Sequence, residues 1–161
     1  MKLMHILFVF VLLMFVQFTR AQQHLSSQSR RAVNLYYDAI SKANVRDYDQ
    51  AIYRLKEALK EDTGFIEAEI MLGEVYSDNL QDSLAIITLK KAIKLNPDFF
   101  PPIYSNLASL EFSNGLYNDA LGHVKTYFTY PNLNPKFRGE NELLLKSCEF
   151  AINAVKNPVP F

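Results

Sequence analysis

The chain has 161 residues, of which 49% are hydrophobic and 21% are charged, and its formal net charge at pH 7 is zero. This length is sufficient for one domain of ordinary size, and the composition is that of a globular chain. Because the charges balance, the sequence provides no strongly basic surface, which argues against nucleic acid or an anionic membrane surface as a partner.

The chain opens with a segment typical of protein export. Soon after Lys2 comes an unbroken apolar run of 11 residues, ILFVFVLLMFV, and Thr19 and Ala21 place small residues at the two positions that a signal peptidase reads. The pattern predicts a signal peptide over residues 1–21, cleaved after Ala21. The alternative is a membrane anchor, but a membrane-spanning helix needs about 20 apolar residues and this run is shorter. We therefore expect an exported protein with no membrane insertion after cleavage.

A polar leader over residues 22–31 precedes a repeat with a period of 34 residues. Ala51 and Ala58 recur as Ala85 and Ala92, and a third copy follows after one inserted residue. Small residues at equivalent positions of the three copies are Ala39, Ala51, Ala58, Gly73, Ala85, Ala92, Ala108 and Ala120, and Tyr127 takes the last position. Such a period predicts stacked helix hairpins.

The repeat resembles the tetratricopeptide repeat. The residues of the second copy that match its signature are Leu72, Gly73, Tyr76, Ala85, Leu89, Ala92 and Pro97. The resemblance covers residues 32 to about 131. It implies an all-α solenoid within a domain over residues 32–156, with repeats at about 32–65, 66–100 and 101–131.

The small residues are expected at the places where helices approach closely. Two antiparallel helices come together only where a side chain is nearly absent, so Gly73 should face Ala85 within one hairpin. Ala92 should let the next hairpin nest against the same helix. Replacing Ala85 by Leu should therefore cost about 1 to 3 kcal/mol.

The helix predicted within residues 80–98 has one apolar face and one wet face. Helical spacing gathers Leu84, Ile87, Ala92 and Leu95 on the apolar face. The wet face should carry Lys90, Lys91 and Lys94. Replacing Lys90 by Leu should accordingly change stability by less than about 0.5 kcal/mol.

A last helix is predicted from Pro135 to about Lys156. Asn134 is a favoured N-cap and Pro135 fits the first helical position. The helix should close the open end of the stack, as repeat arrays require. Its apolar stripe consists of Leu144, Cys148, Ala151 and Val155. Residues 157–161, NPVPF, form a linker-like tail.

Cys148 is the one cysteine of the sequence, so an intramolecular disulfide is impossible. An exported protein with a single thiol can bury it, pair it with another chain or expose it. Burial is the expected outcome, because free cysteine is among the most buried residue types.

The sequence contains no constellation typical of catalysis or of metal binding. His5 lies in the predicted signal peptide, His24 in the leader, and His123 stands alone on a predicted helix, so no metal-ligand pair and no base beside a nucleophile forms. No glycine-rich phosphate loop is present. We expect no cofactor, no metal and no enzymatic activity. An enzymatic alternative would require a turnover that is lost when His123 is replaced.

The first helix of each hairpin should line a concave groove that binds a protein or peptide. The groove residues given by the alignment are Tyr36, Tyr37, Ile40, Glu67, Ile70, Met71, Glu74, Asp78, Ser105, Asn106 and Ser109. They provide an aromatic end, an acidic middle and a polar end. The acidic middle would repel a carboxylate and favour a basic or neutral segment. The alternative is that this surface is merely solvated or covered by a neighbouring domain.

Tetratricopeptide domains of the chaperone-adaptor type hold a partner's terminal carboxylate with Lys, Arg and Asn. The matching positions here are Tyr36, Ile40, Met71, Pro102 and Asn106. Only Asn106 fits, so the sequence argues against a carboxylate clamp of that type.

The end of the chain, KSCEFAINAVKNPVPF, is similar to the matching part of Bacteroidetes envelope proteins of the OmpA family. The matched residues are Cys148, Phe150, Ala151, Ala154, Asn157, Pro158, Pro160 and Phe161. In that family a tetratricopeptide module leads into a WD40-like propeller and a peptidoglycan-binding domain, which this sequence lacks. The resemblance implies a periplasmic scaffold near the outer membrane, with peptidoglycan reached only through those absent domains. A free-standing periplasmic adaptor and a spacer without any ligand are the alternatives.

Overall fold

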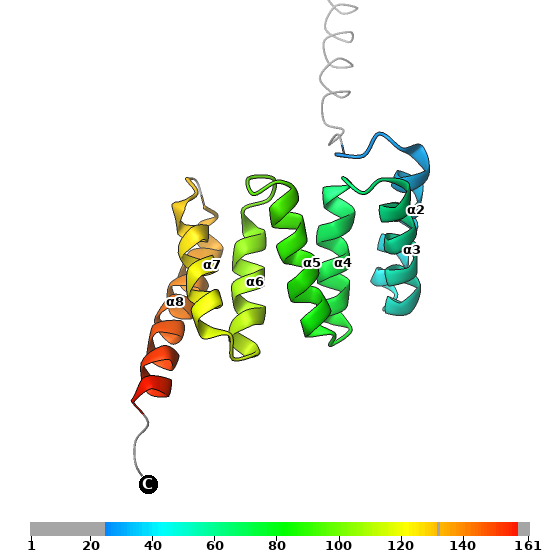
Figure 1. Ribbon diagram of the computed structural model, residues 1–161. Coiled ribbons are helices and arrows are strands. Elements are labelled where there is room, and N and C mark those ends of the chain that lie inside the picture. Colours follow the sequence, from blue (N-terminus) through cyan, green and yellow to red (C-terminus); the bar gives the residue numbers. More distant parts are fainter. Residues whose placement is uncertain (1–24, 132, 158–161) are drawn as a thin grey trace, which may run out of the picture.

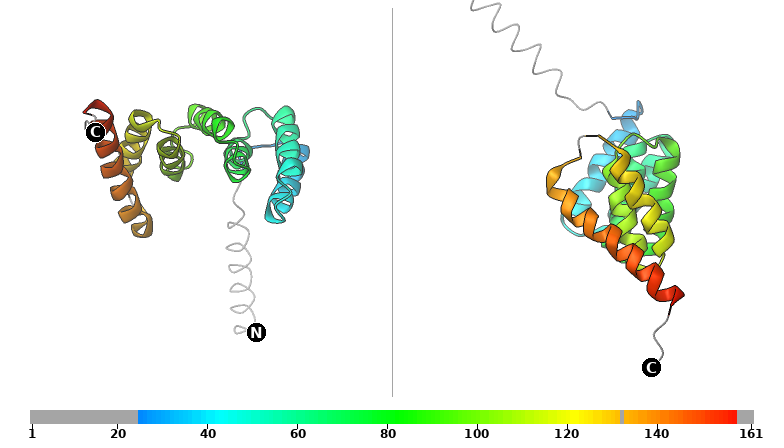
Figure 2. Two further views of the ribbon diagram at one scale, coloured as in Figure 1. Left: turned by 90° about the horizontal axis from the view of Figure 1, so that it is seen from below. Right: turned by 90° about the vertical axis from the view of Figure 1, so that its left-hand side faces the viewer.

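The computed structural model describes residues 25–131 and 133–157, which form a curved stack of seven helices (Figures 1 and 2). The predicted signal peptide lies outside these residues, as do the first residues of the leader and most of the tail. The helices are α2 (Arg30–Asn44), α3 (Tyr48–Glu61), α4 (Ile66–Asp78), α5 (Asp82–Leu95), α6 (Pro102–Ser113), α7 (Tyr117–Thr129) and α8 (Pro135–Lys156).

Consecutive helices pair into hairpins. α2 packs on α3, α4 on α5 and α6 on α7, and α8 packs mainly on α7. The predicted all-α solenoid of three hairpins and a closing helix is therefore confirmed. Within the described ranges no helix is both long and apolar enough to span a membrane.

Local sequence signals set the ends of several helices. Ser29 caps α2 by accepting a hydrogen bond from the backbone N–H of Ala32, and Asp47 caps α3 by accepting one from that of Gln50. Asn134 accepts a hydrogen bond from the N–H of Lys136 at 3.0 Å, so this residue caps α8 as the sequence predicts. Each cap satisfies a backbone donor that the helix leaves free.

The small residues of the repeat are buried where the helices meet. The seven alanines of the set, Ala39, Ala51, Ala58, Ala85, Ala92, Ala108 and Ala120, are at most 1% exposed. A Cβ atom added to Gly73 would lie 2.6 Å from Leu89 Cδ2. The nearest neighbours of Gly73 thus belong to Leu89, one turn beyond Ala85, which corrects the expected facing pair.

The buried face of α5 differs from the predicted one. Its buried residues are Ala85, Ile86, Thr88, Leu89 and Ala92. By contrast, Leu84, Ile87 and Leu95 are 45%, 64% and 42% exposed, so placing them on the packed face was wrong. The physical reason is that α5 packs against both α4 and α6, so these two neighbours, rather than a single apolar stripe, decide which residues of α5 are buried.

The closing helix buries its middle and exposes its end. Cys148 is 0% exposed, which confirms the predicted burial, whereas Val155 is 69% exposed and does not continue the packed stripe. Because α8 has 22 residues and α7 only 13, α8 extends well beyond its neighbour, as Figure 1 shows. The last turns of α8 therefore lack a surface to pack on.

Candidate partner-binding groove

Two adjoining hollows lie on the face formed by α2, α4 and α6. The first has a volume of about 360 Å³ and is lined mainly by α4 and the loop before α6, with Tyr36 of α2 and Leu25. The second, of about 400 Å³, is lined mainly by α4 and α6. Glu74 lines both, so the two hollows adjoin at its side chain and together form the candidate groove.

The structure brings together most of the residues that the alignment placed in the groove. Those that line a hollow are Tyr36, Glu67, Ile70, Met71, Glu74, Asp78, Asn106 and Ser109. Tyr37, Ile40 and Ser105 line neither hollow. Tyr37 is 54% exposed beside the Tyr36 ring, and Ser105 donates a hydrogen bond to Asn141 Oδ1 on α8 at 2.7 Å.

The repeat alignment did not predict some residues of the groove, because they lie in a loop and in the leader rather than on the first helix of a hairpin. Phe99 and Phe100, in the loop between α5 and α6, line the first hollow and are 37% and 40% exposed. Leu25 of the leader lines it as well. The consecutive phenylalanines before Pro101 are a visible apolar signal in the sequence, but they precede the first helix of the third hairpin and have no counterpart in the repeat signature.

The leader packs on the start of α4. The backbone N–H of Ser26 donates to Glu67 Oε1 at 2.9 Å, and its hydroxyl donates to Glu67 Oε2. The same hydroxyl accepts a hydrogen bond from the N–H of Ile66 at 3.0 Å, which supplies a cap that Phe65, the N-cap residue, does not provide. Ser27 donates to Asp62 Oδ2 at 2.6 Å. The two contacts from Ser26 hold the Glu67 carboxylate in the lining of the first hollow.

The groove is acidic and partly shielded from water. Its lining includes Glu67, Glu74 and Asp78, and among the described residues no lysine or arginine lines either hollow. Burial, followed by the negative charge of Asp78, raises the pKa of the Glu74 carboxyl. Burial and the neighbouring carboxylates of Glu67 and Glu74 raise the pKa of the Tyr36 hydroxyl. The arrangement therefore favours a cationic guest over an anionic one.

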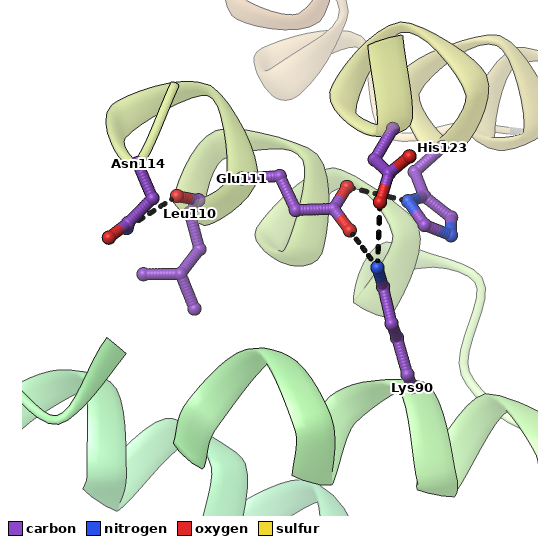
Figure 3. A network of polar contacts seen from close by, with 6 residues as sticks. Lys90, Leu110, Glu111, Asn114 and His123 are labelled. Carbon is purple, nitrogen blue, oxygen red and sulfur yellow. Dashed lines mark hydrogen bonds and ion pairs between the residues drawn. The ribbon is translucent and has the colours of Figure 1, made fainter. Parts of the chain in front are cut away.

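A separate polar network ties α5, α6 and α7 together (Figure 3). The fully buried Glu111 places Oε2 2.6 Å from His123 Nδ1 and Oε1 2.8 Å from Lys90 Nζ, and Lys90 also contacts Asp119 at 3.0 Å. His123 is thus not isolated, and Lys90 is not on a free wet face, which corrects both expectations. Lys91 likewise pairs with the buried Glu69, at 2.7 Å. A buried carboxylate needs such partners, so these lysines hold the structure together.

The network offers a histidine beside a carboxylate, but it lies between helices rather than in the groove. His123 belongs to neither hollow. Within residues 25–131 and 133–157, no group of three or more His, Cys, Asp or Glu side chains is arranged to hold a metal ion. The arrangement is that of an interhelical support.

Comparison with known proteins identifies the repeat. Residues 45–110 match the tetratricopeptide repeat family. Over 106 residues the chain is 26% identical to the peroxisomal targeting signal receptor of Candida albicans, a match that covers 65% of this chain and 18% of the receptor. The chain therefore corresponds to less than a fifth of that protein's length.

Solved structures share the fold at low sequence identity. The first tetratricopeptide domain of Spaghetti (RPAP3), bound to the HSP90 peptide SRMEEVD, has a TM-score of 0.68 and 18% identity; the match covers 81% of this chain and 98% of that one. The Yersinia enterocolitica type III secretion chaperone SycD, in complex with a peptide of the translocator YopD, has a TM-score of 0.66 and 16% identity, with 80% and 97% covered. Residues 45–110 thus match the tetratricopeptide repeat family, and the described helices form an all-α solenoid with the fold of these domains.

Proposed function

We propose that the protein is a non-enzymatic interaction module that binds a segment of another protein in the groove lined by α2, α4 and α6. The observation that carries this proposal is the pair of hollows that adjoin at Glu74, which combine aromatic, aliphatic and acidic side chains on one face. The peptides bound to the RPAP3 and SycD domains support the same mode of use for a solenoid of this type.

The negative charge of the groove makes it unsuited to the acidic segments that some domains of this fold bind. The peptide in the RPAP3 complex, SRMEEVD, carries three acidic residues among its last four. Such a tail would meet Glu67, Glu74 and Asp78 in this groove, and like charges in close contact weaken association. The partner proposed here therefore differs in charge from that peptide.

Site-specific crosslinking tests the proposed function. A photoreactive phenylalanine analogue in place of Phe100, within the groove, should crosslink to a partner protein in the native cells. The same analogue in place of Tyr53 on α3, which is 52% exposed and lines neither hollow, is the control. The purified partner should then bind the wild-type protein and lose affinity for a Phe99→Ala, Phe100→Ala variant. Equal crosslinking from both positions, with unchanged affinity of the variant, would leave the spacer role as the better account.

We further propose that the module works in the bacterial cell envelope, exported to the periplasm as the N-terminal part of an outer-membrane-associated protein of the OmpA family. The support is the predicted signal peptide over residues 1–21 and the tail motif around Cys148 and Pro158, both read from the sequence. A mass measurement on protein from the native envelope tests both parts. A chain that begins at Gln22 supports export, and one that still begins at Met1 contradicts it. A mass well above that of 161 residues supports the OmpA-type assignment, whereas a chain ending at Phe161 supports a free-standing adaptor.

A further inference from the structure

We infer that the partner segment carries a lysine or arginine next to a bulky apolar residue, with the cationic group beside Glu74 and the apolar side chain in the first hollow. This inference rests on the proposed function, since it specifies the ligand of the same groove. The ligand of the groove is thus a positively charged segment of a protein.

Glu74 differs from several other acidic side chains of the described residues, which are paired with a cation. Glu69 pairs with Lys91, Glu111 with Lys90, and Asp38 with Arg54 at 2.8 Å. Glu74 is half-buried and forms no hydrogen bond or ion pair with any other side chain of the described residues. A carboxylate withdrawn from water without a cation is costly, so a cation supplied by a partner would gain more here than on an open surface.

The walls of the first hollow offer an aromatic ring for the cation and an apolar surface for its neighbour. The Tyr36 ring packs 5.1 Å from the Phe65 ring and 5.6 Å from the Tyr37 ring, centroid to centroid, so it is held in place. A cation between this ring and the carboxylates would gain from both. Phe99 and Phe100 lie at the same hollow with more than a third of their surface exposed, which provides an apolar wall for the neighbouring side chain.

Without a bound cation, the charge on Glu74 should lower the stability of the folded protein by a measurable amount. Because burial and Asp78 raise the pKa of Glu74 in the folded state, folding favours the protonated form, and ionised Glu74 destabilises the fold. Glu74→Gln should therefore raise the melting temperature at pH 7. The difference should shrink as the pH falls below the pKa of an ordinary carboxyl group, where Glu74 is neutral in both states. The same variant should weaken binding of the cation, so its two effects have opposite signs.

Peptide selection tests the inference without assuming a sequence. Random 12-residue peptides displayed on phage are selected on the protein, and the enriched sequences are synthesised. We expect enrichment of Lys or Arg beside Leu, Ile, Phe or Met. Replacing the basic residue by Gln should weaken binding about tenfold. Glu74→Gln in the protein should weaken binding by a similar factor. Combining this change with the one in the peptide should weaken binding little further, as is expected for two groups in direct contact.

Glu69→Gln is the matched control, because it makes the same substitution on the same helix at a carboxylate that already pairs with Lys91. It should lower the melting temperature and leave the affinity of the peptides unchanged. Selected peptides that lack basic residues, yet lose affinity on Phe99→Ala, Phe100→Ala, would overturn the inference and leave the proposed function standing. A selection that yields no peptide dependent on these phenylalanines would overturn the proposed groove function itself.

Discussion

At the scale of single residues, the three hairpin turns place a left-handed residue at equivalent positions. Arg46, Leu80 and Gly115 have φ values of 60°, 56° and 76°. Glycine adopts this conformation freely, whereas a residue with a Cβ atom pays about 1 to 2 kcal/mol for it. Leu80 is 89% exposed, so packing does not offset that cost.

Leu80→Gly is therefore expected to stabilise the protein. The free energy gained by relieving the strained backbone exceeds the entropic cost of the more flexible glycine. The free energy of unfolding should therefore increase by about 0.5 to 1 kcal/mol. Urea unfolding of the two proteins measures it. The reverse change at the equivalent position, Gly115→Leu, should destabilise by a similar amount, and a loss of stability in Leu80→Gly would contradict the assignment of strain.

Lys90 provides a second test at this scale, on a point where the sequence-based expectation was wrong. Lys90→Leu removes a cation from the fully buried Glu111, so it should cost about 1 to 3 kcal/mol rather than almost nothing. Lys94→Leu, on the exposed side of the same helix, should change stability by less than about 0.5 kcal/mol. Equal melting temperatures for the two variants would show that the ion pair contributes nothing.

At the scale of elements, the start of α4 depends on the leader. Ser26 accepts a hydrogen bond from the N–H of Ile66 and donates to Glu67, so Ser26→Ala removes the cap of the helix. We expect a loss of about 1 kcal/mol, with faster hydrogen exchange of the amides in the first turn of α4. Ser41→Ala, which removes only an exposed hydrogen bond to the backbone of its own helix, is the control. Unchanged exchange in Ser26→Ala would contradict the capping role.

The closing helix gives a prediction about reactivity. Burial, with a smaller contribution from the charge of Glu149, raises the pKa of the Cys148 thiol and disfavours the reactive thiolate. Cys148 is also 0% exposed. The native protein should react with a thiol reagent far more slowly than the protein in urea, and the native rate should rise as the solenoid is destabilised. Fast, complete labelling under native conditions would contradict the packing of α8.

At the scale of the whole molecule, the stack of hairpins could be predicted from the sequence. Each repeat needs small residues at the same few positions, and these recur at a fixed period. The residues at positions where helices touch, such as Ala51 and Ala120, must be small. The 34-residue period locates these positions in the sequence without a structure. The Glu111 network was missed because its partners Lys90 and His123 come from two other helices, and neither residue has a signature of its own.

The sequence predicted part of the helical lining of the groove and missed its irregular part; the helical residues that it missed are Ser77, Leu89, Leu110 and Ser113. Met71 and Glu74, which the alignment placed in the groove, line the first hollow, since a repeat fixes the orientation of each first helix. Leu25, Phe99 and Phe100 come from a leader and a loop, whose paths depend on tertiary contacts that a period does not encode. The sequence therefore predicted Ile70 and Met71 of the apolar lining, whereas Leu25, Phe99 and Phe100 required the structure.

The most direct test of groove binding is the affinity of the crosslinked partner, or of the selected basic peptide, for a Glu74→Lys, Asp78→Lys variant by titration calorimetry. Its control is Asp49→Lys, Glu140→Lys, which makes the same change in net charge at exposed positions that line neither hollow. Binding through the groove predicts that the first variant loses affinity at least about tenfold while the control retains it. Equal affinity of both variants and the wild-type protein would contradict it.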